Sequence, residues 1–293
     1  CLSRVATVNL TAGCAHGCVY CYAKGYSTYP GDETVVLYTN TLAKLRDELP
    51  RKRKPTVAIY FSPSSDLFQP VPEVQDLGYE ILEYLFRMRQ RVSFLTKGRI
   101  PDRHMELLCA NAEKVHAGIG VTTLDEDVAE AFEPNAAKPG DRIAQAKQLV
   151  TAGVLTQIRL DPILPGLTDD SATFEAICQA VGDAGIERVA ASVLFLRPAV
   201  TAGLRRRAEH HHAFQMVLKR FEQSQRLGIH ADKATVASLP LAERQDIYAR
   251  LMSAAERHGI SVHVCACKNP DVTALSCSIA GRWPEVDPEP SLF

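Results

Sequence analysis

This chain of 293 residues lacks the long apolar run that a membrane span requires, and it lacks a signal-peptide pattern. It also lacks an excess of either charge, because 33 basic and 34 acidic residues leave a net charge of -1. That balance argues against a strong global attraction to nucleic acid. No flexible linker and no internal repeat divides the chain. We therefore expect a cytoplasmic globular protein, built as one large domain or as a domain with a smaller extension.

Nine cysteines stand out against these absences. In a chain without an export signal, they indicate metal or redox chemistry rather than structural disulfides. Two of them, Cys109 and Cys178, fall singly in helical patterns, so we expect them to be buried as small apolar side chains. Six others form two groups of three, one near each end of the chain: Cys14, Cys18 and Cys21, then Cys265, Cys267 and Cys277.

Apolar runs alternate with amphipathic stretches along the first two hundred residues. The runs predicted as strands are 5–10, 56–62, 91–98, 115–123, 155–166 and 188–196. The stretches predicted as helices are 40–49, 76–89, 103–114, 142–153 and 173–185. Strands that alternate with helices indicate βαβ units around a parallel sheet, and right-handed crossovers would curve that sheet into a barrel. We predict an α/β fold, a partial (β/α)6 TIM-type barrel over residues 1–200.

The remaining residues, 201–293, are predicted as a packed C-terminal extension that carries the second cysteine group. Its expected elements are one charged helix over 202–225, a second helix over 239–259, and a strand over 260–270. His210 to His212 would lie on the first of these helices. Consecutive helical residues point about 100° apart, so we do not expect the three imidazoles to bind one metal together.

Polar side chains follow the predicted strands where each strand ends. They are Ser62, Ser65, Asp66, Thr96, Lys97, Thr122, Thr123, Arg159, Asp161 and Arg197. In parallel α/β folds ligands bind at the carboxyl ends of strands, so we expect these side chains to line an active site. The alternative is that individual members only cap the helix that follows.

The first cysteine group has three thiols, and that number helps to distinguish between kinds of metal site. A closed zinc site takes four nitrogen or sulfur ligands, and a disulfide would leave one of the three thiols over. Three thiolates that hold a [4Fe-4S] cluster leave one iron with an open coordination position for another ligand, and soft sulfur ligands suit such clusters.

The Cys14-x3-Cys18-x2-Cys21 spacing, with Tyr20 before the last cysteine, resembles the signature of the radical S-adenosylmethionine (SAM) superfamily. The segments TAGCAHGCVYCYAKG, YFSPSSDLFQPVPE, FLTKGRIPDRHMELL and IRLDPILPGLTDD, together with 120–153, occur in order and resemble the spore photoproduct lyase branch. The resemblance implies a [4Fe-4S] cluster on the three cysteines, with SAM bound to the fourth iron. It also implies an external one-electron reductant of flavodoxin or ferredoxin type. Reductive cleavage of SAM would give a 5′-deoxyadenosyl radical that abstracts hydrogen from a substrate.

The resemblance also implies roles for individual residues. The Ser62 to Asp66 stretch would meet the methionine amino group, Lys97 the SAM carboxylate, and the strand around Ile163 the adenine. Tyr22, directly after Cys21, would relay a hydrogen atom or shape the pocket, with simple packing as the alternative. The full set expected to contact SAM is Tyr20, Ser62, Ser65, Asp66, Lys97, Thr122, Thr123, Arg159 and Ile163.

The second cysteine group poses the same question near the other end of the chain. Strand alternation would put Cys265 and Cys267 on one face, and the KNPD turn would bring Cys277 back toward them. We predict an auxiliary [4Fe-4S] cluster there. Zinc with His263 as fourth ligand and thiols without metal remain as alternatives. The cluster would donate sulfur to a substrate, relay electrons, or act as a structural staple.

The function that follows is a radical SAM enzyme acting on a small organic, nucleoside-like substrate, with sulfur insertion as the sharpest hypothesis. A lesion-repair lyase acting on nucleic acid and a non-catalytic metal-binding module are the alternatives. Spore photoproduct lyase carries a hydrogen-donor cysteine in the second-strand loop, whereas residues 62–66 here contain none. The basic runs at 51–54 and 205–207 are typical of solvated faces rather than of a nucleic-acid surface.

Overall fold

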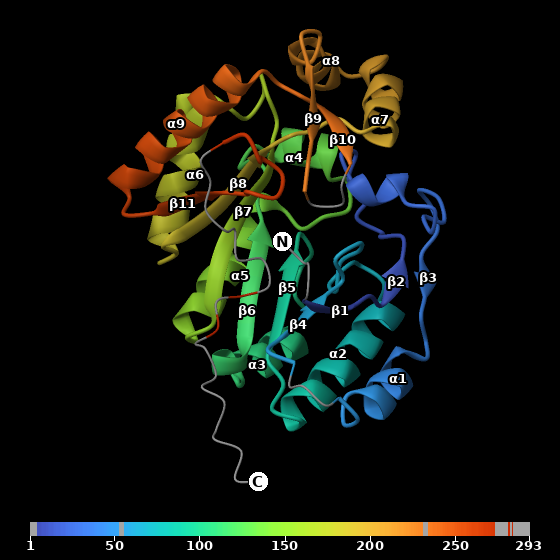
Figure 1. The fold of residues 1–293 in the computed structure, drawn as a ribbon. Helices are drawn as coiled ribbons and strands as arrows, with labels where there is room; N and C mark the ends of the chain where they lie inside the picture. Colours follow the sequence, from blue (N-terminus) through green and yellow to red (C-terminus); the bar gives the residue numbers. More distant parts are fainter. Residues whose placement is uncertain (1–4, 53–55, 231–233, 273–280, 282, 284–293) are drawn as a thin grey trace.

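The computed structural model describes residues 5–52, 56–230, 234–272, 281 and 283. Its centre is a seven-stranded sheet in the order β1-β4-β5-β6-β7-β8-β11, in which all neighbours run parallel (Figure 1). The strands are β1 (Ala6–Val8), β4 (Ile59–Phe61), β5 (Val92–Thr96), β6 (Val115–Gly120), β7 (Leu155–Ile163), β8 (Arg188–Val193) and β11 (Ser261–Val264). Within the described residues the sheet does not close, so the predicted partial barrel is confirmed.

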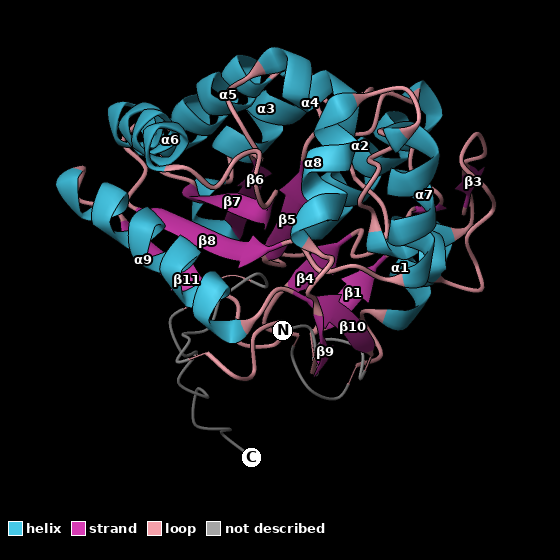
Figure 2. Cartoon of the chain, turned by 90° about the horizontal axis from the view of Figure 1, so that it is seen from above, coloured by secondary structure: helices cyan, strands magenta, loops and turns pink. Residues whose placement is uncertain are grey.

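Most of the helices cover the outer side of the curved sheet, as the view from above shows, whereas α7 (Pro198–Ala208) and α8 (His212–Arg220) lie beyond the carboxyl ends of the strands (Figure 1 and Figure 2). The others are α1 (Thr41–Glu48), α2 (Pro72–Arg87), α3 (Asp102–Cys109), α4 (Glu126–Phe132), α5 (Pro139–Thr151), α6 (Ser171–Asp183) and α9 (Leu241–Arg257). Proline at the first position fixes φ where α2, α5 and α7 begin. Carboxylates of Asp125 and Asp170 accept backbone N–H groups at the starts of α4 and α6.

Smaller elements complete the fold. They are β2 (Thr11–Ala12), β3 (Val36–Leu37), β9 (Gln225–Gly228), β10 (Thr235–Ser238) and the 3-10 helices η1 (Tyr22–Gly25) and η2 (Ala112–Lys114). β2 pairs with β3, and β9 with β10, in two antiparallel ribbons. In the part of the chain that the structure describes, no helix is both long and apolar enough to span a bilayer.

The two faces of the sheet have different surroundings. Along β8, Val189, Ala191 and Val193 pack into the main core together with the helices. Ala190 instead packs with Cys265 in a separate small cluster. Because successive strand residues point to opposite faces, Cys265 lies on the concave face of the sheet, away from the helices. Cys178 is buried in the main core as expected, and Cys109 is half-buried against it.

One local expectation needs correction, and some elements were not expected. The single helix expected over 202–225 is wrong, because the chain turns at 209–211 and forms α7 and α8. His211 has an extended backbone, and its imidazole accepts the N–H of Ala213 at 3.2 Å, so it caps α8 instead of continuing α7. The short helix α4 and the β9–β10 ribbon have weak apolar periodicity and were not predicted. The strand predicted at 260–270 is confirmed over Ser261–Val264, and it joins the main sheet beside β8.

Candidate active site

The first cysteine group surrounds one hollow. Cys14, Cys18 and Cys21 lie in the loop after β2 and line a small pocket of about 30 Å³, together with Lys24 and Tyr29. None of the three thiols is in a disulfide. Burial raises the pKa of each thiol, to about 12 for Cys18. A metal centre would supply the positive charge that keeps buried thiols ionised, so the donor set fits a three-cysteine cluster.

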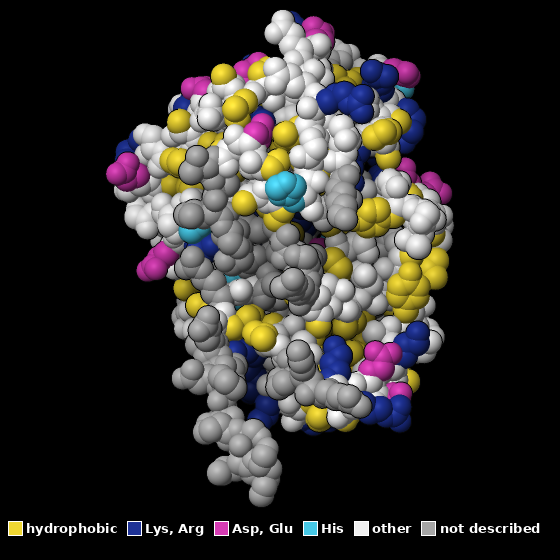
Figure 3. All heavy atoms as spheres, viewed as in Figure 1, with side chains coloured by type: hydrophobic (Ala, Val, Ile, Leu, Met, Phe, Trp, Pro, Cys, Tyr) yellow, Lys and Arg dark blue, Asp and Glu magenta, His cyan; other side chains and the backbone are white. Residues whose placement is uncertain are grey.

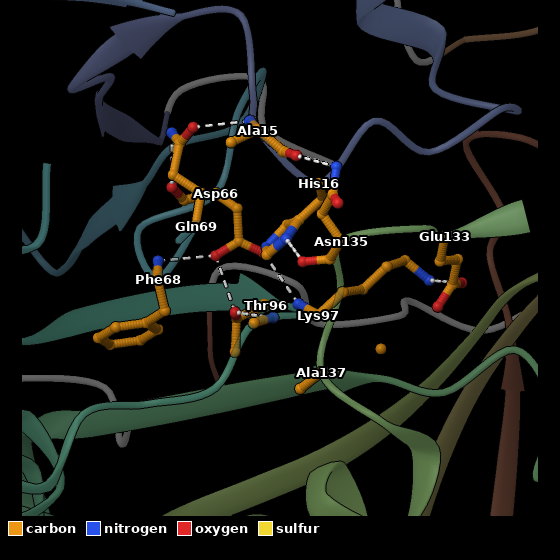
Figure 4. Close-up of polar contacts among 12 residues, drawn as sticks. Ala15, His16, Asp66, Phe68, Gln69, Thr96, Lys97, Glu133, Asn135 and Ala137 are labelled. Carbon is orange, nitrogen blue, oxygen red and sulfur yellow. Dashed lines mark hydrogen bonds and ion pairs between the residues drawn. The ribbon is translucent and has the colours of Figure 1, made fainter. Parts of the chain in front are cut away.

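Residues far away in sequence hold this loop in place (Figure 4). The side chain of Gln69 accepts the N–H of Ala15 at 2.8 Å. Asn135 donates from Nδ2 to the carbonyl of Ala15 at 2.9 Å. The backbone of Val19 donates to the carbonyl of Phe132 at 2.9 Å. The loop conformation therefore depends on contacts with the segments after β4 and α4.

His16, inside the loop, forms an ion pair with Asp66, whose Oδ2 lies 3.1 Å from Nε2 (Figure 4). The carboxylate also accepts the backbone N–H groups of Phe68 and Lys97, each at 2.8 Å, and the hydroxyl of Thr96 at 2.8 Å. With four partners, Asp66 supports the cysteine loop. The same oxygens are therefore engaged already, whereas the resemblance assigned this residue to SAM.

A glycine makes the close approach behind His16 possible. A Cβ built on Gly98 would lie 2.2 Å from the carbonyl oxygen of Phe68 and 3.2 Å from Cε1 of His16. No side chain fits at that separation, so the glycine after Lys97 lets β5 end directly against the cysteine loop.

Glu133, at the end of α4, is the main site residue that the sequence analysis missed. Its side chain is 1% exposed and accepts hydrogen bonds from the hydroxyls of Tyr20 and Thr122 and from Nζ of Lys97, which lies 3.0 Å away. Arg142 pairs with the other carboxylate oxygen at 2.5 Å. Burial alone would raise the pKa of Glu133, but the charges of Lys97 and Arg142 lower it to about 2. No motif marked this glutamate, because its partners come from four separate segments.

Two serines near the end of β4 fit a ligand site. Oγ of Ser62 and Oγ of Ser65 are buried and have no hydrogen-bond partner among the described residues. Ser62 also has a positive φ of 50°, a conformation that costs energy for a residue with a side chain. Buried hydroxyls without partners are costly, so these two fit the polar groups of a bound molecule such as SAM.

Three other residues predicted to contact the cofactor already have other partners or surroundings in the structure. Thr123 accepts the N–H of Asp125 at 3.0 Å, which is the local role considered as its alternative. Ile163 is 2% exposed in the main core after the cis peptide at Pro162. Arg159 is buried and donates to Asp161 at 3.1 Å. The roles of these three residues toward SAM stay predictions.

Tyr22 begins the 3-10 helix η1, directly after Cys21. The residue is 39% exposed, and its hydroxyl donates to the carbonyl of Pro63. The guanidinium of Arg197 lies 5.7 Å from the ring centroid. Burial raises the pKa of this phenol most, neighbouring Tyr60, Tyr26 and Cys21 raise it further, and Asp161 adds the least.

The second cysteine loop lies at the carboxyl end of β11. Cys265 is a free thiol whose Sγ lies 3.6 Å from Sγ of Cys267, and Cys267 is in a disulfide that does not involve Cys265. This differs from the expectation of metal-binding thiols without disulfides, because a cysteine in a disulfide cannot bind a cluster as a thiolate. Cys277, the third predicted ligand, lies outside the described residues. Lys268 contacts both carboxylate oxygens of Asp161 on β7, at 2.7 and 2.6 Å. The charges of Lys268 and Arg159 outweigh burial and lower the pKa of Asp161 to about 2.

Buried hydrogen bonds stabilise the turn that follows these cysteines. Asn269 is fully buried, and its Nδ2 donates to the carbonyl of Cys265 at 3.1 Å. Its Oδ1 accepts from Arg244 at 3.1 Å and from the hydroxyl of Tyr248 at 2.9 Å, both on α9. Arg244 also forms a bidentate pair with Asp271. The predicted KNPD turn is confirmed.

The chain is similar in sequence to a known superfamily and to individual proteins. The model of the radical SAM superfamily matches residues 8–177. An uncharacterized protein of Mycobacterium tuberculosis (strain H37Rv) is 31% identical over 202 residues, which cover 65% of this chain and 59% of that protein. The chain thus spans under two thirds of that relative. A radical SAM Nα-GlyT isomerase of Pseudomonas phage M6 is 26% identical over 155 residues, 53% of this chain and 32% of the isomerase.

Solved structures with the same fold include a spore photoproduct lyase mutant with bound AdoMet and dinucleoside spore photoproduct. It superposes with a TM-score of 0.65 at 14% identity, over 88% of this chain and 75% of the lyase. The methyltransferase TsrM from Kitasatospora setae gives a TM-score of 0.53 at 14% identity, over 70% of this chain and 39% of TsrM. The family match covers more than half of the chain and includes the three cysteines around one pocket, so this protein belongs to the radical SAM superfamily.

Proposed function

We propose that this radical SAM enzyme acts on a small organic substrate held between two metal centres, one at each cysteine loop. The observation that carries the proposal is that the second loop opens onto the concave face of the sheet. Cys265 packs against Ala190 on that face, and Lys268 reaches across to Asp161 on β7. Asp161 adds a small part to the raised pKa of Tyr22, the residue after Cys21, which supports a place for the first loop near the same space. In this proposal both cysteine loops would border the substrate.

The bound groups would supply the chemistry. Reductive cleavage of SAM provides a 5′-deoxyadenosyl radical for hydrogen abstraction, and a sulfide of the second centre is the atom available for insertion. The chain itself holds the first centre with three thiols and binds SAM with Lys97 and the two serines near β4. Arg159, Asp161 and Lys268 form the polar wall opposite.

Iron and sulfide counting on anaerobic protein tests the second centre. We expect about eight irons in the wild type and about four in Cys265→Ala, since each cubane cluster holds four. Cys109→Ala, which removes a half-buried thiol outside both loops, is the matched control and should keep about eight. A wild type with about four irons would contradict a second cluster.

Sulfur transfer has its own test. Reconstitution with ³⁴S-sulfide should place ³⁴S in the product if the second centre donates sulfur. A protein with two clusters whose product contains no labelled sulfur would contradict donation, while electron relay or substrate binding would remain. Formation of 5′-deoxyadenosine after reduction with dithionite would rule out a purely non-catalytic metal-binding module.

The distance between the two C-terminal sulfurs favours a second candidate for this loop. Two thiolates on one tetrahedral zinc ion lie about 3.8 Å apart, given Zn–S bonds of about 2.3 Å. The separation of 3.6 Å between Cys265 and Cys267 is close to that value, but Cys267 is in a disulfide that would have to be reduced before it could bind a metal. His263 is expected on the same face as Cys265 and would be the nitrogen ligand. The described residues contain no group of three His, Cys, Asp or Glu side chains already placed around one metal ion, so this site would require side chains to move. One zinc per chain that is lost in Cys265→Ala, with iron unchanged at about four, would assign the loop to zinc.

Repair of nucleic acid, the activity of the lyases of similar fold, receives less support. On the described part of the face seen in Figure 3, basic side chains lie in separate groups among acidic and apolar ones. A DNA-binding surface concentrates such charges, and its affinity falls steeply with salt. Binding of an oligonucleotide duplex that weakens steeply between low and physiological salt would favour repair over our proposal.

A further inference from the structure

Glu133 gathers four partners around a side chain that is 1% exposed. Its Oε1 accepts hydrogen bonds from Tyr20, Thr122 and Lys97, and its Oε2 forms an ion pair with Arg142. A carboxylate with several charged and hydroxyl partners holds those partners in fixed positions. The four partners come from the cysteine loop and from the ends of β5, β6 and α5.

The charges in this cluster do not cancel. Glu133 carries one negative charge, while Lys97 and Arg142 each carry one positive charge. Arg142 is 1% exposed, and its other donors go to the carbonyls of Gly120 at 2.9 Å and Ala137 at 2.6 Å. Arg142 is therefore committed to Glu133 and the backbone. Lys97, at 13% exposure, keeps a charge that can attract an incoming anion.

Gly120 and Tyr20 determine where the side chain of Lys97 lies. A Cβ built on Gly120 would lie 2.8 Å from Cγ and 3.2 Å from Nζ of Lys97, so only glycine leaves room for the lysine to lie across β6. Its ammonium is 5.3 Å from the ring centroid of Tyr20, within the range of a cation–π contact. The lysine thus contacts Tyr20, the residue directly before Cys21.

We propose that Glu133 is a positioning residue that holds Lys97 and Tyr20 together, so that the lysine meets the SAM carboxylate beside the cluster. Arg142 neutralises the second carboxylate oxygen, which leaves the lysine charge for the ligand. This inference rests on the proposed function, because it takes SAM as the ligand of Lys97. Glu133 itself does not touch the reacting atoms and acts through its partners.

A double-mutant cycle tests the proposal. SAM binding is measured by equilibrium dialysis on anaerobic, cluster-loaded protein without reductant, so that no turnover occurs. We expect Glu133→Gln to weaken SAM binding roughly tenfold, the worth of one charge-assisted hydrogen bond. In the Lys97→Met background the same change should have less than about a twofold effect, because coupled residues are not additive. Equal losses in both backgrounds, or unchanged binding in Glu133→Gln, would overturn the proposal.

Two further variants keep the test decisive. Glu130→Gln removes an exposed carboxylate from the same helix and should bind SAM like the wild type. Gly120→Ala moves Lys97 without changing any charge, so it serves if Glu133→Gln fails to fold. We expect it to weaken SAM binding in the wild-type background and not in Lys97→Met. A loss in both backgrounds would contradict the assignment.

The outcomes also separate this inference from the function on which it rests. A wild type that binds no SAM would contradict the proposed function itself. A wild type that binds SAM, with a Glu133→Gln variant that binds it equally well, would contradict only the role of Glu133. A positioning role further predicts that Glu133→Gln raises KM for SAM more than it lowers kcat.

Discussion

The two cysteine loops lie at the carboxyl ends of the two edge strands of one sheet, but different parts of the protein hold them. The first loop is held by side chains after β4 and α4, among them Asp66, Gln69 and Asn135. The second is held by its own Asn269 and by Arg244 and Tyr248 of a single helix, α9. The first loop thus depends on the assembled barrel, whereas the second can be altered through α9 alone.

The largest expected effect comes from the thiols themselves. Cys18→Ser should reduce 5′-deoxyadenosine formation to background, because the first centre then lacks one of its three ligands. Cys265→Ser should retain SAM cleavage while losing the substrate product, as measured by chromatography of both products. Loss of SAM cleavage in both variants would mean that the two loops do not have separate tasks.

Asp66 tests how strongly the barrel holds the first loop. Asp66→Asn removes the charge that pairs with buried His16, and breaking a buried ion pair costs about 3 kcal/mol. Urea unfolding of the apoprotein measures that loss, and iron analysis should show that the first centre is depleted. Asp76→Asn, which changes an exposed carboxylate on α2, is the control and should differ little from the wild type. An Asp66→Asn protein of full stability and iron content would show that the ion pair does not hold the loop.

Arg244 provides the corresponding test for the second loop. Arg244→Gln removes hydrogen bonds to Asn269 and Asp271 and should lower the free energy of unfolding by about 2 kcal/mol. The expected metal loss is confined to the second loop, with the first centre and SAM cleavage retained. Arg250→Gln, a partly exposed site on α9, is the matched control. If Arg244→Gln depletes the first centre equally, the separation of the two loops is wrong.

The smallest effect is a pH dependence. The hydrogen bond from Arg244 lowers the pKa of Asp271 from 3.8, so the pair stabilises the fold above that pH and its contribution disappears as the pH falls through the lowered value. Asp271→Asn should therefore be about 1 kcal/mol less stable than the wild type at neutral pH. The difference should shrink below about pH 3.8. A difference that stays constant from neutral pH to pH 3 would contradict this account.

Most of the correct predictions came from patterns among residues that are close in sequence. The six strands, five of the helices between them and the Cys14–Cys21 motif follow from local periodicity and spacing. The division into α7 and α8 was missed, because a histidine with a capping side chain carries no strong sequence signal. Asn135, Gln69 and Glu133 were also missed as site residues. Their contacts with the cysteine loop span 54 to 120 residues of sequence, and no local pattern records such pairs.

The sequence by itself determined the superfamily, the parallel α/β architecture and the thiols of the first centre, because motif spacing and strand periodicity are local properties. Only the tertiary structure decided which buried charges surround those thiols. It turned Asp66 toward His16, gathered Lys97, Tyr20 and Arg142 on Glu133, and brought Lys268 to Asp161. These arrangements depend on the order in which strands pair, and strand order brings together ionisable groups that the chain keeps far apart.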